Sequence, residues 1–220
     1  MGRAMASLLH FSAAAVATIF TMIDPFGLVP MYLAAVSGVP APVRKRVPLK
    51  AAVIAGIVVL LAGVAGRVVL HVLGITLPAF SISGGALLFL VALDMIFGRP
   101  TGARETETER SEAITRSDPS VFPIAFPMIA GPGSILTVIL LVELAKGEPL
   151  KLIVVIGALL LAIATCYLTM LFAERLMRLA GQTGMHVLTR LAGVVLAALA
   201  VQFVLNGITG YIHPEVLPTP

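Results

Sequence analysis

Two segments break otherwise apolar stretches with residues that disfavour helices. The segment IDPFGLVP, residues 23–30, places an acid, two prolines and a glycine behind twenty uncharged residues. The segment IAGPGSI, residues 129–135, has a similar character. Proline lacks a backbone N–H and clashes with the preceding helical turn, and glycine is a poor helix former. We therefore expect both segments to interrupt a helix.

Such breaks expose backbone groups that can bind a ligand. The helix N-termini near Gly27 and near Pro132–Gly133 would present N–H donors and partial positive charge, so either could hold an anionic group. The preceding helix ends offer carbonyl oxygens, and Asp24 adds negative charge. A small zwitterion fits both polarities. The alternative is a pair of proline kinks with packing glycines and no ligand.

Eight residues around the breaks form the expected substrate site. They are Thr21, Asp24, Pro25, Gly27, Gly131, Pro132, Gly133 and Ser134. Thr21 lies three residues before Asp24 and can share a helix face with it. Three roles are open for Asp24: it binds the substrate, carries a proton, or caps the second half-helix.

Four other polar residues have either a coupling role or a structural one. Asp94 and Arg190 lie near the expected inner face, where they form an ion pair or are solvated separately. Gln202 and Asn206, four residues apart, hydrogen-bond across helices or line the cavity. No cofactor is expected, and the single cysteine cannot build a cysteine-based metal site. A coupling ion, H⁺ or Na⁺, is compatible with the pattern.

The composition is that of an integral membrane protein. Of 220 residues, 59% are hydrophobic and 12% are charged, whereas soluble domains carry about a quarter charged residues. A membrane helix needs about 20 apolar residues. Such runs satisfy their own backbone hydrogen bonds as helices, so we predict an all-α membrane protein with six transmembrane helices. The runs cover residues 6–37, 49–73, 78–97, 120–142, 152–173 and 191–211, with a connector at 174–190.

The two halves of the chain show a weak internal repeat. Pro25 and Pro132 are 107 residues apart, and residues 85–94 match residues 193–202 at an offset of 108. Each half has three helices, so the halves cross the membrane in opposite directions, as a 3+3 inverted repeat with helices 1 and 4 broken near mid-membrane. The predicted units are residues 1–97, a charged cytoplasmic linker at 98–119, residues 120–212, and a short tail at 213–220.

The distribution of Lys and Arg predicts the orientation. With the N-terminus outside, the inner loops hold eleven such residues and the outer side four, which favours both termini outside. The inner ones are Arg44, Lys45, Arg46, Lys50, Arg99, Arg104, Arg110, Arg116, Arg175, Arg178 and Arg190. We therefore interpret the positive net charge through the positions of Lys and Arg in the loops, which set the orientation in the membrane. A basic patch with interleaved aromatics is absent, so no nucleic-acid partner is expected.

Four motifs resemble the MarC family of six-pass bacterial inner-membrane proteins. They are DPFGLVPMYLA (24–34), GGALLFLVALDM (84–95), FPIAFPMIAGPGSI (122–135) and RLAGVVLAALAVQFVLNGI (190–208). The resemblance implies a multi-pass protein of a bacterial or archaeal cell membrane. Its SnatA-type branch implies transport of glycine, alanine or similar amino acids. The first motif of the family often has Asn-Pro-x-Gly, where this chain has Asp24.

The expected function is therefore secondary transport of a small neutral amino acid or a related small polar solute, and not catalysis. A passive channel would tolerate the same breaks. A non-transport membrane role, such as an intramembrane enzyme or a scaffold, is a further alternative. The chain has no G-x-x-x-x-G-K-[ST] sequence for ATP binding. Oligomerisation, transport direction and the coupling ion stay open.

Overall fold

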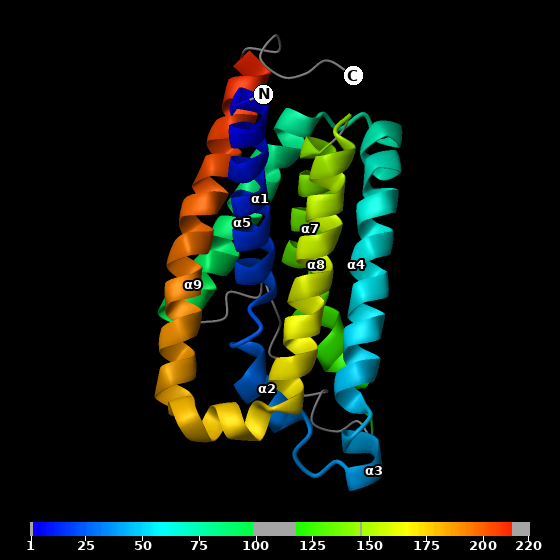
Figure 1. The fold of residues 1–220 in the computed structure, drawn as a ribbon, viewed down its shortest axis with the longest axis vertical. Helices are drawn as coiled ribbons and strands as arrows, with labels where there is room; N and C mark the ends of the chain where they lie inside the picture. The colour runs from blue at the N-terminus through cyan, green and yellow to red at the C-terminus, as the bar shows by residue number, and fades with distance from the viewer. Residues whose placement is uncertain (1, 99–117, 146, 213–220) are drawn as a thin grey trace.

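The computed structural model describes residues 2–98, 118–145 and 147–212, and the regular secondary structure of these residues is helical. The long helices run side by side along one axis, and the first helix begins at the same end of the bundle at which the last helix ends (Figure 1). Most of the predicted linker and all of the predicted tail fall outside the described residues, so their boundaries stay predictions.

The helices follow the apolar runs of the sequence. They are α1 (Gly2–Ile23), α2 (Leu28–Ala35), α3 (Ala41–Arg44), α4 (Val47–Val72), α5 (Leu77–Phe97), η1 (Ser120–Ile129), α7 (Pro132–Leu144), α8 (Pro149–Leu171) and α9 (Ala173–Ile212). Within the described residues, five spans are long and apolar enough to cross a membrane, with α1 and α2 in one of them. A sixth is obtained if the bent pair η1 and α7 counts as one span. The prediction of an all-helical membrane protein is confirmed.

Local sequence signals explain most helix ends. Prolines occupy the first or second position of α4, α5, α7 and α8, where their missing N–H has no helical acceptor to lose. The Thr76 hydroxyl accepts a hydrogen bond from the Ala79 N–H at the start of α5. Gly98 closes α5 with φ 65°, a left-handed conformation that suits glycine.

The connector that the sequence predicted at residues 174–190 is helical and forms the first part of α9. Strong helix formers such as Leu, Met, Glu and Arg keep the segment helical. The helical geometry is interrupted at Gly181, with φ 65° and ψ 175°. Before this point α9 runs across one end of the bundle, and after it α9 rises along the bundle (Figure 1).

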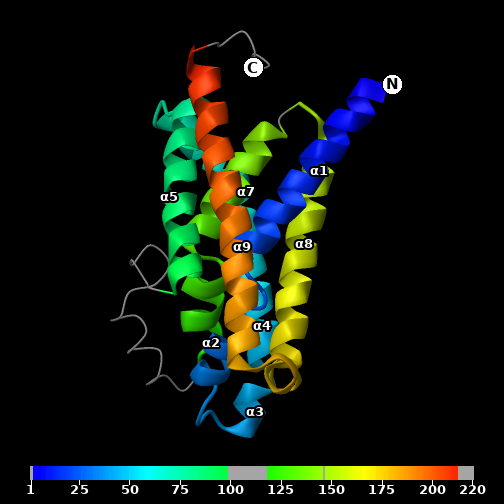
Figure 2. The same cartoon turned by 90° about the vertical axis from the view of Figure 1, so that its left-hand side faces the viewer.

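Helices α5 and α9 pack along each other through small residues (Figures 1 and 2). A Cβ built on Gly85 would lie 2.7 Å from the Ala200 carbonyl oxygen. A Cβ built on Gly193 would lie 3.1 Å from the Ala92 carbonyl oxygen. The backbones therefore come close at both points, with side-chain atoms of Val204, Met95 and Ile96 at similar distances, and we call this contact the α5–α9 seam.

Asp118 connects α4 to the start of η1. Its Oδ2 accepts a hydrogen bond from Lys50 Nζ at 2.6 Å. Its Oδ1 accepts from the Ser120 N–H at 3.0 Å and from the Ser120 hydroxyl at 2.6 Å. These hydrogen bonds, that from Lys50 first, lower the pKa of the Asp118 carboxyl from its ordinary 3.8 to about 2.

The seam predicts a difference between two glycine substitutions. We expect Gly85→Ala to lower stability by about 1–3 kcal/mol, because the added methyl meets the Ala200 carbonyl and forces the helices apart. Gly157→Ala in α8 is the matched control, because no atom lies within 4 Å of the added methyl. Thermal unfolding in detergent measures both. Equal unfolding temperatures for the two variants would contradict the proposed tightness of the seam.

The Asp118 interactions predict a pH-dependent contribution to stability. A depressed carboxyl pKa stabilises the folded state above the ordinary value of 3.8, and this gain is lost as the pH falls to about 2. The Asp118 side chain is 38% exposed, so solvent screening limits the gain to about 1 kcal/mol or less. We expect Asp118→Asn to unfold at a lower temperature than the wild type at pH 6, with the difference vanishing near pH 2. A pH-independent difference would contradict this assignment.

Candidate functional site

The first break lies between α1 and α2, at residues 24–27. The Asp24 N–H donates to the Phe20 carbonyl at 2.9 Å and closes α1. Asp24 itself has φ 48° and is the only described non-glycine residue with positive φ. Asp and Asn are the residues that adopt this conformation most readily after glycine. The chain direction therefore changes at Asp24.

Asp24 also satisfies the start of α2. Its Oδ1 accepts a hydrogen bond from the Gly27 N–H at 3.0 Å, and its carbonyl accepts from the Leu28 N–H at 3.1 Å. Two donors of the first turn are thus already in use. Asp24 therefore binds the start of α2 through its side chain and its carbonyl, and its three considered roles stay predictions.

The second break lies between η1 and α7, which are bent by 52°. Within η1, Phe122 and Phe126 have extended backbone angles, and each precedes a proline, which disfavours helical geometry at the residue before it. Across the break, the Ser134 hydroxyl donates to the Ile129 carbonyl at 2.8 Å. This bond satisfies one carbonyl at the end of η1.

The start of α7 leaves N–H donors available. The first helical bond at this end runs from the Ile135 N–H to the Gly131 carbonyl at 3.0 Å. Pro132 has no N–H, and within the described residues the N–H groups of Gly133 and Ser134 have no backbone acceptor. Both residues are buried. Buried donors at a helix N-terminus favour an anionic or acceptor group.

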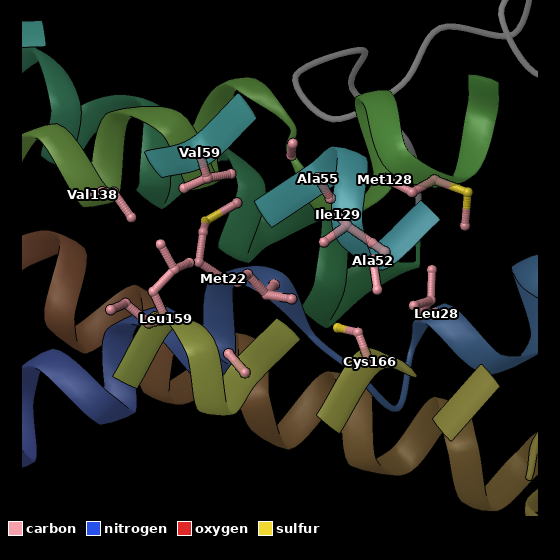
Figure 3. Packing of buried hydrophobic residues seen from close by; sticks show 14 of the residues in the cluster. Met22, Leu28, Ala52, Ala55, Val59, Met128, Ile129, Val138, Leu159 and Cys166 are labelled. Atoms are coloured by element: carbon pink, nitrogen blue, oxygen red, sulfur yellow. The ribbon is translucent and has the colours of Figure 1, made fainter. Parts of the chain in front are cut away.

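A small cavity adjoins these donors. Its volume of about 10 Å³ is close to the minimum for one water molecule. It is lined by Met22, Val91, Pro127, Met128, Gly131, Pro132, Gly133 and Ser134. A Cβ built on Gly133 would overlap the Met22 Cε and lie 2.9 Å from its Sδ. Figure 3 shows Met22 in the middle of the buried cluster, surrounded by side chains from α4, α7 and α8.

Two hydroxyl side chains add to the polar character of the region. Thr21 is buried on the last turn of α1, and it does not line the cavity. Thr137, one turn into α7, is 1% exposed, and its Oγ1 has no hydrogen-bond partner in the described part of the chain.

Thr189 of α9 also lies at the first break, although it is not among the site residues predicted from the sequence. A Cβ built on Gly27 would lie 2.8 Å from the Thr189 Oγ1 and would overlap the Asp24 Oδ2. Both oxygens therefore crowd the same space over Gly27. No sequence spacing relates residue 189 to residue 27, so only the packing of α2 against α9 could reveal this proximity.

The four coupling or structural candidates lie elsewhere. Asp94 is buried near the end of α5, and its carbonyl accepts from the Gly98 N–H. The Arg190 guanidinium lies 3.9 Å from a Cβ built on Gly98, and an Asp94–Arg190 ion pair stays a prediction. Gln202 Nε2 donates to Asn206 Oδ1 at 2.8 Å on the exposed side of α9, within one helix and not across two.

Comparisons with known proteins agree with one another. A family model described as MarC family integral membrane protein matches residues 9–212. A UPF0056 membrane protein of Methanocaldococcus jannaschii, MJ1677, is 35% identical over 92% of this chain and 98% of its own length. The Escherichia coli UPF0056 membrane protein YhcE is 31% identical over 90% and 92%. No solved structure matches the chain.

The geometry at Asp24 predicts that two substitutions differ in stability. Asparagine keeps both the left-handed preference and a side-chain oxygen for the Gly27 N–H, so Asp24→Asn should unfold within a few degrees of the wild type. Asp24→Ala loses both and should cost about 1–3 kcal/mol. Thermal unfolding in detergent compares them. Equal losses in the two variants would show that the cap does not stabilise the break.

Proposed function

Because the chain belongs to the MarC family of integral membrane proteins, we propose that it is a secondary transporter of small neutral amino acids or a related small polar solute. One observation carries this proposal. The N–H donors of Gly133 and Ser134 lie buried beside a cavity at the break before α7. A break that only redirected the chain would not need donors left available in the core.

The chemistry of the region fits a zwitterion. A substrate carboxylate would bind the N–H donors at the start of α7, where the helix dipole favours negative charge. An ammonium group needs acceptors, which the carbonyl end of α1 and the oxygens of Asp24 and Thr189 supply. The glycines at both breaks allow backbone to approach a ligand closely, so a small substrate is favoured.

The two breaks have unequal roles in this proposal. Asp24 occupies the first donors of α2, whereas α7 keeps its donors open. We therefore assign the anionic group of the substrate to α7 alone, which narrows the sequence-based expectation that either helix start could hold it. The ammonium group is assigned to the side of the site nearer α1 and α2.

The α5–α9 seam supports the proposed inverted repeat. At the offset of 108 residues, Gly85 corresponds to Gly193 and Ala92 corresponds to Ala200. Gly85 faces the Ala200 carbonyl, and Gly193 faces the Ala92 carbonyl. Replacing each residue by its counterpart in the other half therefore turns the first contact into the second. Such exchange is expected of a two-fold axis between the halves. We propose that the halves move about this axis during alternating access.

The arrangement of charge supports the proposed orientation in the membrane. The start of α1 and the end of α9 lie at one end of the bundle (Figure 1). At the opposite end, Arg44 of α3 pairs with Glu174 of α9, and Lys50 pairs with Asp118. Because basic residues favour the cytoplasmic side, we propose that both termini face outside in a cell membrane. We propose no enzymatic role.

Uptake into proteoliposomes tests this function. We expect saturable uptake of labelled glycine, alanine or serine, and accumulation driven by a proton or sodium gradient. Gly133→Ala should raise the half-saturation concentration about tenfold or more, because the methyl takes space beside the donors. Its fold should tolerate the change, since the methyl meets the flexible end of Met22. Gly157→Ala is the control and should behave as wild type.

The outcomes separate the competing functions. Uptake that never saturates and never exceeds equilibrium would indicate a passive channel. The absence of uptake for all three amino acids, in protein shown to be folded, would overturn the amino acid proposal. Equal effects of Gly133→Ala and Gly157→Ala on the half-saturation concentration would show that the substrate does not bind at the start of α7.

A further inference from the structure

We infer that Met22 sets the upper size limit of the substrate, an inference that rests on the proposed transport function. Met22 lies on the last turn of α1 and is 3% exposed. Its thioether lies directly against Gly133, the residue whose N–H is one of the two available donors. No other described side chain approaches Gly133 as closely.

Two residues with long unbranched side chains line the cavity, Met22 and Met128, and of these only Met22 lies against Gly133. The polar wall is the start of α7, which is backbone and cannot retreat without unwinding the helix. Val91 of α5 is β-branched and stiff. Met22 is unbranched, with three rotatable bonds and a polarisable sulfur, so its end can move where a branched residue cannot.

Substrate and Met22 must therefore share one space. A ligand whose carboxylate reaches the Gly133 and Ser134 N–H groups has to displace the Met22 methyl, because the cavity has room for about one water molecule. Moving the end of one methionine makes room for a hydrogen or methyl substituent. A branched side chain needs the space that the methionine itself fills, so glycine and alanine are favoured over valine and leucine.

The position of Met22 is fixed by the break. The Asp24 N–H to Phe20 carbonyl bond holds the last turn of α1, and Asp24 turns the chain immediately afterwards. Met22 thus lies next to the first break in the sequence, and its side chain contacts the second break at Gly133. It is a specificity residue that connects the two halves of the site.

Selectivity measurements on purified variants test the role of Met22. Half-saturation concentrations for glycine, alanine, valine and leucine are compared in wild type, Met22→Ala and Met22→Leu, with Met170→Ala as control. Met170 is a buried methionine in α8 that does not line the cavity. We expect Met22→Ala to shift the valine-to-glycine preference toward valine about tenfold or more. Met170→Ala should keep the wild-type ratio, and Met22→Leu, which is branched and fills the same space, should not shift the ratio toward valine.

The outcomes distinguish this inference from the function it rests on. If wild type takes up glycine and Met22→Ala keeps the wild-type ratio, the role of Met22 is overturned while transport stands. If wild type takes up none of the four, the proposed function fails and the inference with it. Because Met22→Ala can lose stability, Met22→Val provides a milder truncation. An unchanged ratio in a folded Met22→Val variant would also count against the inference.

Discussion

Backbone N–H and C=O groups at a helix break need partners when the break is buried in an apolar core. The two breaks of this protein meet that need differently. At the first, Asp24 accepts from the N–H groups of Gly27 and Leu28. At the second, the Ser134 hydroxyl satisfies a carbonyl, while two N–H donors at the start of α7 stay available. The proposed ligand follows from this difference, because only the second break leaves buried N–H donors, and these donors adjoin the cavity and Met22.

The conformation of Asp24 also explains which residues suit the first break. The position requires a left-handed backbone and a short side-chain acceptor for the N–H three residues later. Aspartate and asparagine meet both requirements, and neither needs a charge to do so. The presence of Asn in the similar motif of MarC family proteins is therefore compatible with the same geometry.

The sequence predicted what depends on composition and local signals. Apolar runs predicted the helical membrane fold, and four motifs predicted the family; both predictions are confirmed. Contacts between distant segments could not be predicted from the sequence, because no local pattern places Thr189 over Gly27 or Met22 against Gly133. The sequence predicted a connector at 174–190 without assigning it a secondary structure, and its residues, which favour a helix, form the first part of α9. The inverted repeat and the roles of the site residues stay predictions.

The α5–α9 seam has a mechanical consequence. At Gly85 and Gly193 a carbonyl oxygen and side-chain atoms of the facing helix would lie within about 3 Å of an added Cβ, so little space is left between the two helices. Such a contact holds one arrangement or separates altogether, and so behaves as a stiff spine. The compliance of the molecule is then concentrated away from the seam, in the short helix α2 and in the break that precedes it. For distance measurements between labelled sites, the spine would provide the fixed reference frame against which those segments are tracked.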